Sequence, residues 1–191
     1  MVSYNERCFF VFLKELQKAA LWKVLEYFAL GNEPIHIKGL ARKLGISPAS
    51  AFKDLKILEK SGFLEAQKAG NSLIYSSKDL PLFLEFKRLV FLLYAMPFFE
   101  KFLKQNHEVL GLAVFGSIAS GSFDKNSDID LLVLSPEKAL RFQALEELGL
   151  RIGMEAKPIV FSIGEWRKLA KDKKPFVESI LQNKIAVSGE F

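Results

Sequence analysis

The sequence predicts an α+β protein of two domains, a mainly helical N-terminal domain and a C-terminal domain with a mixed sheet, joined by a long linker helix. Basic residues gather in the first half, where helices are followed by one hairpin and a Leu- and Phe-rich helix, and strands alternate with helices after residue 107. The expected bounds are 1–78, 79–106 and 107–191. At 191 residues the chain is long enough for both domains to bury a core.

The N-terminal domain is expected to begin with two helices. Apolar side chains recur at helical spacing over residues 5–29, and the Gly-Asn-Glu-Pro run that follows ends this first helix. A short second helix is predicted over residues 37–44. Gly45 ends it, because glycine readily adopts the left-handed conformation found after a helix C-terminus.

A third helix and a hairpin complete this domain. Ser47 is predicted to cap the helix over residues 49–61, with Pro48 at the first helical position. Residues 63–66 and 72–76 are expected to pair as strands, because the Lys-Ala-Gly-Asn run between them has the chemistry of a turn.

The order helix, helix, turn, helix and hairpin over residues 37–75 resembles the winged helix-turn-helix domains of the ArsR and MarR families of regulators. The resemblance implies double-stranded DNA as a partner. The charge agrees, since residues 36–78 hold eight Lys/Arg against three Asp/Glu, a net of +5, whereas residues 106–191 have a net charge of −1. A winged helix that only binds another protein is the alternative.

The resemblance places the exposed N-terminal side of the third helix in the major groove. We expect Ser50, Phe52 and Lys53 to read bases, although Phe52 could instead pack on the hairpin. Lysines and the wing would hold phosphates, which makes binding depend strongly on salt. The candidate DNA-binding residues are Lys43, Ser47, Ser50, Phe52, Lys53, Lys56, Lys68 and Asn71.

The linker over residues 79–106 is rich in Leu and Phe on more than one helical face, so it must be buried on more than one side. Its partners are expected to be the N-terminal domain together with either the C-terminal domain or a second copy of the chain. Because modules of this kind usually pair on two half-sites, we expect a homodimer. Pro97 should bend or break the helix.

The C-terminal domain contains a pattern suited to phosphate chemistry. An apolar strand over residues 109–115 ends in Gly116 and Ser117, and a second apolar strand begins with Asp128 and Asp130. Residues two apart on a strand share a face, so these two carboxylates can share the hard cation Mg²⁺. Gly116 would let the backbone approach a triphosphate, and Ser117 would offer it a hydroxyl and amides.

A Gly-Ser pair, ten residues and then Asp-x-Asp resembles the signature of the nucleotidyltransferase superfamily, whose fold is similar to that of DNA polymerase beta and which includes the minimal nucleotidyltransferases. This implies a nucleoside triphosphate as ligand and Mg²⁺ as cofactor. Active members carry a third carboxylate on a later strand. Here that strand, 156–161, has no acid: Glu155 precedes it, and Lys157 or Pro158 stands about where the acid is expected.

The rest of the chain gives structural and cellular expectations. Helices are predicted over 137–148, 165–170 and 175–181, and a last strand over 185–187. The single cysteine, Cys8, cannot form an internal disulfide, which favours a reducing cytoplasm. No run reaches the roughly 20 apolar residues of a membrane-spanning helix.

Three functions fit these observations. We favour a DNA-binding transcriptional regulator whose C-terminal domain senses a nucleotide or a partner. The second is an active Mg²⁺-dependent nucleotidyltransferase that transfers NMP to a protein or a small molecule. The third, suggested by the minimal nucleotidyltransferases, is an antitoxin-like protein that pairs with a separate helical toxin.

Overall fold

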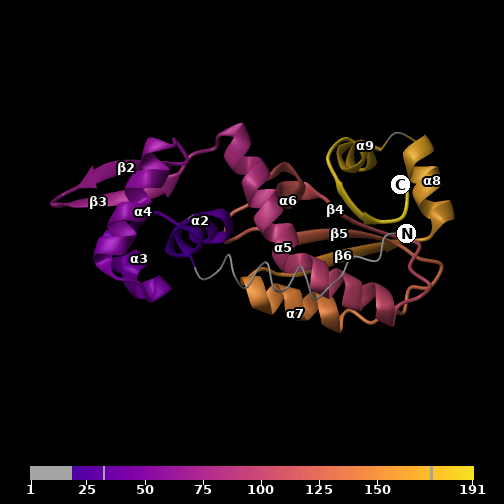
Figure 1. Ribbon diagram of the computed structural model, residues 1–191. Helices are drawn as coiled ribbons and strands as arrows, with labels where there is room; N and C mark the ends of the chain where they lie inside the picture. Colours follow the sequence, from indigo (N-terminus) through magenta and orange to yellow (C-terminus); the bar gives the residue numbers. More distant parts are fainter. Residues whose placement is uncertain (1–18, 32, 173) are drawn as a thin grey trace. The chain divides into compact units, whose positions relative to one another are not determined.

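A computed structural model describes residues 19–31, 33–172 and 174–191 (Figure 1). The chain forms two compact units, which divide between Phe83 and Leu84. This division falls inside helix α5 (Pro81–Gln105), and the bounds expected from the sequence stay a prediction. Among the described residues, no helix has both the length and the hydropathy needed to span a bilayer.

The first unit has the predicted helices. Helix α2 (Ala20–Gly31) begins later than the first predicted helix, and the part of that prediction before residue 19, together with Cys8, lies outside the described residues. Helix α3 (Ile37–Leu44) ends at Gly45, which has a φ of 64° and so lies in the left-handed region. Helix α4 (Pro48–Lys60) begins as predicted, because Ser47 Oγ accepts a hydrogen bond of 3.0 Å from Ser50 N.

A small antiparallel sheet packs with these helices. Strands β2 (Leu64–Ala69) and β3 (Ser72–Ser77) pair with Ala69 opposite Ser72, so that two residues form the turn between them. Strand β1 (Ile35–His36), which the sequence did not predict, adds to the other edge of β3 and gives the order β1-β3-β2. The core of this unit includes Val24, Phe28, Leu40, Leu55, Leu58 and Tyr75, all 4% exposed or less.

The second unit contains the mixed sheet that the sequence predicts, with the strand order β6-β5-β4-β7. Strand β4 (Gly111–Val114) lies antiparallel to β5 (Ile129–Leu134) and to β7 (Ile185–Ser188). Strand β6 (Ala156–Phe161) lies parallel to β5. A parallel neighbour needs a crossover connection, and helix α7 (Gln143–Ile152) supplies it.

Helices cover both faces of this sheet. On one face Leu132 and Leu134 pack in a core with Trp166 of α8 (Ile163–Lys171) and Val177 of α9 (Pro175–Gln182). Residues of β5 that alternate with these, such as Val133, are also fully buried and therefore point to the other face. Figure 1 shows α7 on that second side.

The predicted start of α7 was wrong, and of the two effects predicted for Pro97 the break does not occur. Helix α7 begins at Gln143 instead of residue 137, because the buried side chain of Asn106 holds the preceding segment: its Nδ2 donates to Arg141 O at 3.1 Å, and its Oδ1 accepts from Arg141 N at 2.8 Å. Helix α5 continues through Pro97 without a break. Residues of α5 on both sides of Pro97, Phe91 and Phe99, are fully buried, and this packing offsets the lost backbone hydrogen bond.

Candidate functional site

The turn after β4 is built around Gly116. Its φ of 68° lies in the left-handed region, where other residues are strained. A Cβ at this position would also overlap Asp130 Oδ2, so the carboxylate of Asp130 lies directly against the glycine backbone. Phe115 N, one residue earlier, donates a hydrogen bond of 3.0 Å to Asp130 O. The structure therefore brings Gly116 and Asp130 together at one end of β5, as the nucleotide-site prediction requires.

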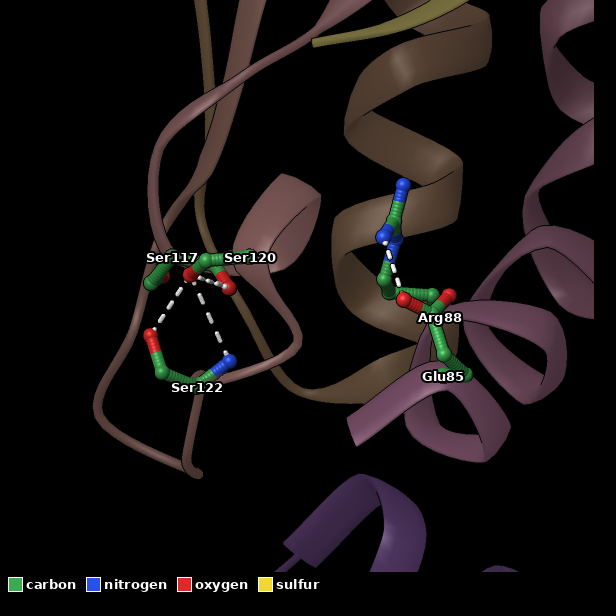
Figure 2. Close-up of polar contacts among 5 residues, drawn as sticks. All are labelled: Glu85, Arg88, Ser117, Ser120 and Ser122. Atoms are coloured by element: carbon green, nitrogen blue, oxygen red, sulfur yellow. Dashed lines mark hydrogen bonds and ion pairs between the residues drawn. The ribbon is translucent and has the colours of Figure 1, made fainter. Parts of the chain in front are cut away.

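Ser117 belongs to the short helix α6 (Gly116–Ser120), and a group of serines orders the loop that follows it. Ser120 Oγ donates to Ser117 O at 2.9 Å and lies 2.7 Å from Ser122 Oγ (Figure 2). One residue further on, Phe123 O accepts a hydrogen bond from Nζ of Lys87, a buried residue of α5. These contacts were not predicted from the sequence, although three serines within the six residues 117–122 are a visible signal.

Asp128 and Asp130 lie at the start of β5. The loop before them is held by Asp124, whose Oδ1 accepts hydrogen bonds from Asn126 N at 2.9 Å and from Ser127 Oγ at 3.2 Å. Because side chains alternate along a strand, Asp130 points to the same face as Leu132, toward the side covered by α8 and α9. Both acids are half-buried.

The position beside the two acids on the neighbouring strand is held by Lys157. In the parallel register of β5 and β6, Lys157 pairs with Asp130. Its Nζ lies 2.6 Å from Asp128 Oδ2 and 4.0 Å from Glu155 Oε2. The sequence left Lys157 and Pro158 as the residues at the expected place of the third acid. In the structure Lys157 lies there, and Glu155 lies near that lysine.

The charges of this group are coupled. Burial raises the pKa of Asp130, the negative charge of Asp128 raises it further, and the ammonium of Lys157 opposes both effects. The hydrogen bond to Asp128 raises the pKa of Lys157. The ammonium is therefore retained beside two acids, one of which holds its proton more firmly than usual.

The same residues test whether divalent metal ions fit. Two carboxylates on one face offer the hard oxygen ligands that Mg²⁺ prefers. Among the described residues, however, no group of three or more His, Cys, Asp or Glu side chains is placed to hold a metal ion. The carboxylates thus fit one cation, which would lie beside the Lys157 ammonium, and no third acid among the described residues supports a second cation.

The N-terminal half of α4 presents the predicted base-reading residues. Phe52 is 46% exposed, so its ring is not buried against the hairpin, and Lys53 is also exposed. Ser50 is half-buried, and its N–H already serves the cap. At the turn of the hairpin, Lys68 and Asn71 are both exposed. These residues can reach a ligand without any change in the core.

Two of the predicted phosphate-binding lysines form ion pairs within the first unit. Lys43 Nζ lies 3.2 Å from Glu33 Oε2, and Lys56 Nζ lies 2.7 Å from Glu59 Oε2. The side chains of Lys43 and Lys56 are 55% and 37% exposed. Exposed ion pairs of this kind contribute little to stability, so a DNA phosphate can compete for both ammonium groups.

Comparison with known families assigns both parts of the chain. Residues 98–187 match the family model of the nucleotidyltransferase domain, and residues 21–68 match that of the IclR helix-turn-helix domain. The chain carries a helix-turn-helix domain and a nucleotidyltransferase domain. The matched helix-turn-helix model is the IclR one, whereas the resemblance noted above named ArsR and MarR.

Two curated relatives match part of the chain. The heat-inducible transcription repressors HrcA of Parafrankia sp. and Frankia casuarinae are 33% and 32% identical to it over 75 residues. Each match covers 38% of this chain and 22% of the repressor, so the chain spans about a fifth of their length.

Three solved structures are similar in part. A toxin–antitoxin structure with AMP-PNP has a TM-score of 0.37 and 18% identity, over 50% of this chain and 73% of that one. A homodimeric winged helix-turn-helix DNA-binding domain from Mycobacterium bovis has a TM-score of 0.31 and 17% identity, over 47% of this chain and 85% of that one. A protein of Sulfolobus solfataricus described as a nucleotidyltransferase has a TM-score of 0.33 and 21% identity, over 54% of this chain and 84% of that one.

Proposed function

We propose that the protein is a cytoplasmic transcription regulator, whose helix-turn-helix domain binds an operator and whose nucleotidyltransferase domain binds a nucleoside triphosphate with Mg²⁺. The observation that carries the proposal is the exposed N-terminal side of the Ser47-capped helix α4, which presents Phe52 and Lys53. A helix presented in this way can enter the major groove with its first turns against base edges.

On DNA, each candidate residue has a distinct role. Ser50, Phe52 and Lys53 read bases, with Lys53 suited to guanine and the Phe52 ring to a thymine methyl. Ser47 keeps its hydroxyl on the helix and contacts the backbone near it. Phosphates are held by Lys43, Lys56, Lys68 and Asn71, and the excess of basic residues in this domain strengthens these contacts. A homodimer places two such helices on two half-sites.

In the second domain, the nucleotide binds where Gly116 and Asp130 meet. The backbone of Gly116 and Ser117 holds the triphosphate, because amides at the start of a helix bind phosphate oxygens, and the glycine leaves room for the Asp130 carboxylate beside them. Asp128 and Asp130 hold Mg²⁺, which neutralises phosphate charge when it is bound. Since Lys157 takes the place of a third acid, binding is favoured over transfer of the nucleotide.

The DNA-binding part is tested by selecting duplexes from a random pool with the full chain and measuring affinity by fluorescence anisotropy. Lys53→Ala should weaken binding to the selected duplex about tenfold and relax specificity at one base pair, since one good base contact is worth roughly 1–3 kcal/mol. The matched control is Lys168→Ala, which removes an exposed lysine from α8 of the other domain. Equal losses in the two variants, or no selected duplex, would exclude the proposed interface.

The nucleotide-binding part is tested by calorimetric titration of ATP, GTP, CTP and UTP with Mg²⁺ into the wild type and the Asp128→Ala/Asp130→Ala variant. Binding that needs Mg²⁺ and is lost in the double variant is the expected result. If neither protein binds any triphosphate, this part of the proposal is wrong and only the DNA-binding part stands.

A further inference from the structure

One position of the candidate nucleotide site carries the opposite charge from the one that metal binding needs. Lys157 pairs with Asp130 in the sheet register, and its Nζ lies 2.6 Å from Asp128 Oδ2. The side chains of Lys157 and Asp128 are 48% and 36% exposed, so the pair lies at an accessible end of the sheet. Solvent and ligands can therefore reach this ion pair.

A divalent cation and the Lys157 ammonium compete for the negative charge of Asp128 in this arrangement. One of its two carboxylate oxygens, Oδ2, already lies within hydrogen-bond distance of Lys157 Nζ. A bound cation would also lie a few ångströms from the positive ammonium, and like charges at this distance repel even where water screens them. The acid closest to Lys157 in the sequence is Glu155. Its Oε2 lies 4.0 Å from Lys157 Nζ, so it partly balances the charge of the ammonium.

We infer that Lys157 is the residue that makes this domain a nucleotide-binding domain instead of a transferase: its ammonium competes with a divalent cation for Asp128 and excludes a second cation from the position of the missing acid. The inference rests on the proposed nucleotide site, and it names the residue that determines how that site can work. One cation enters only in competition with the Lys157–Asp128 ion pair. Lys157 thus determines how many metal ions the site can bind.

The test uses Mn²⁺ alone, with no nucleotide, and follows the free ion by electron paramagnetic resonance in the presence of the full chain. Lys157→Met keeps an unbranched side chain only one atom shorter and removes its charge, and Lys157→Glu supplies an acid at the same position. Lys168→Met is the matched control, because it removes the charge of another exposed lysine of the same domain. Thermal unfolding followed by circular dichroism verifies that all variants are folded.

Lys157→Met should bind Mn²⁺ at least about tenfold more tightly than the wild type, the change expected when a unit charge next to a divalent ion is removed. Lys157→Glu should bind it more tightly still or take up a second ion. Lys168→Met should stay within about twofold of the wild type. Equal affinity of the wild type and Lys157→Met would overturn the inference, even if Lys157→Glu binds Mn²⁺ more tightly.

The outcomes also separate this inference from the proposed function. If the wild type binds a nucleotide with Mg²⁺ but the Lys157 variants gain no affinity for Mn²⁺, the proposed function stands and the inference is wrong. If the wild type binds no nucleotide but Lys157→Met binds Mn²⁺ more tightly than the wild type, the inference stands and the proposed nucleotide binding is wrong. If no variant binds Mn²⁺, the inference is wrong whatever the wild type does with nucleotides.

Discussion

The contact between Gly116 and Asp130 gives a prediction for the substitution Gly116→Ala. Gly116 has a φ of 68°, and an added Cβ would overlap Asp130 Oδ2. Gly153 of the same domain has a φ of 76°, but a Cβ there would meet nothing within 4 Å. The two substitutions therefore share the cost of the left-handed backbone and differ in the displacement of Asp130.

The expected magnitudes follow from these two costs. An alanine in the left-handed region destabilises a protein by about 1–2 kcal/mol, and this is the whole effect expected for Gly153→Ala. Gly116→Ala must also rotate the Asp130 side chain away from its rotamer, which adds about 0.5–1.5 kcal/mol. In the background of Asp130→Ala the additional cost should disappear, so the two sites should be coupled by about 1 kcal/mol.

The assay is urea unfolding of the full chain followed by tryptophan fluorescence. Trp22 lies in the first unit, and Trp166 lies in the core of the second unit at 4% exposure. In a Trp22→Phe background the fluorescence reports the second unit alone, and the free energy of unfolding is compared among the variants. If Gly116→Ala and Gly153→Ala destabilise this unit equally, or if Asp130→Ala recovers nothing, Asp130 is not held against Gly116.

Three further predictions concern the framework of each unit. Ser47→Ala should lower the unfolding free energy of the first unit by about 1 kcal/mol through loss of the N-cap, measured by Trp22 fluorescence in a Trp166→Phe background, and unchanged stability would disprove the cap. Hydrogen bonds from Ser162, backbone first, and from Lys138 lower the pKa of Glu165 to about 2. Since the folded pKa lies below the ordinary 4.5, the carboxylate stabilises the fold above pH 4.5, and this effect is lost as the pH falls through about 2. The unfolding free energy of Glu165→Gln should therefore be lower than that of the wild type at neutral pH and equal to it at about pH 2 and below. Asn106→Ala should lower the unfolding free energy of the second unit by about 1–3 kcal/mol, because the buried Phe102 carbonyl and the part-buried backbone of Arg141 lose a partner. A loss below about 0.5 kcal/mol, measured by Trp166 fluorescence in the Trp22→Phe background, would contradict this.

The parts of the fold that were predictable depend on local chemistry. The turn between α3 and α4 needs a residue in the left-handed region, and Gly45 meets that need at the expected place. The start of α4 needs a cap, which Ser47 provides. Signals of this kind act within a few residues, so they can be read from the chain without knowledge of its partners.

The errors came from contacts between distant segments. Asn106 follows α5 and holds Arg141, 35 residues later, which delays the start of α7. Pro97 is accommodated because α5 is packed along its length, and no local rule reports that packing. In both cases a tertiary contact overrode a sound local preference.

The sequence predicted that either Lys157 or Pro158 lies beside the two acids, but it could not distinguish between them. Strands β5 and β6 are parallel and are joined through α7, so no short turn sets their register. A shift by one residue would turn Lys157 to the opposite face and bring Pro158 beside Asp130. Only the pairing of Asp130 with Lys157 in the structure distinguishes these two arrangements.

The charge of Asp130 at the start of β5 indicates whether this end of the sheet binds a ligand or only supports the fold. Burial raises the pKa of Asp130, which means that the fold makes its charged form less favourable than in water. Among the described residues, none donates a hydrogen bond to its carboxylate, and an apolar residue against Gly116 would avoid this cost. A carboxylate held at a cost to stability, beside a glycine that no other residue can replace without strain, is typical of a binding site. The ammonium of Lys157 opposes part of this cost, and in the proposed function a bound cation would offset more of it.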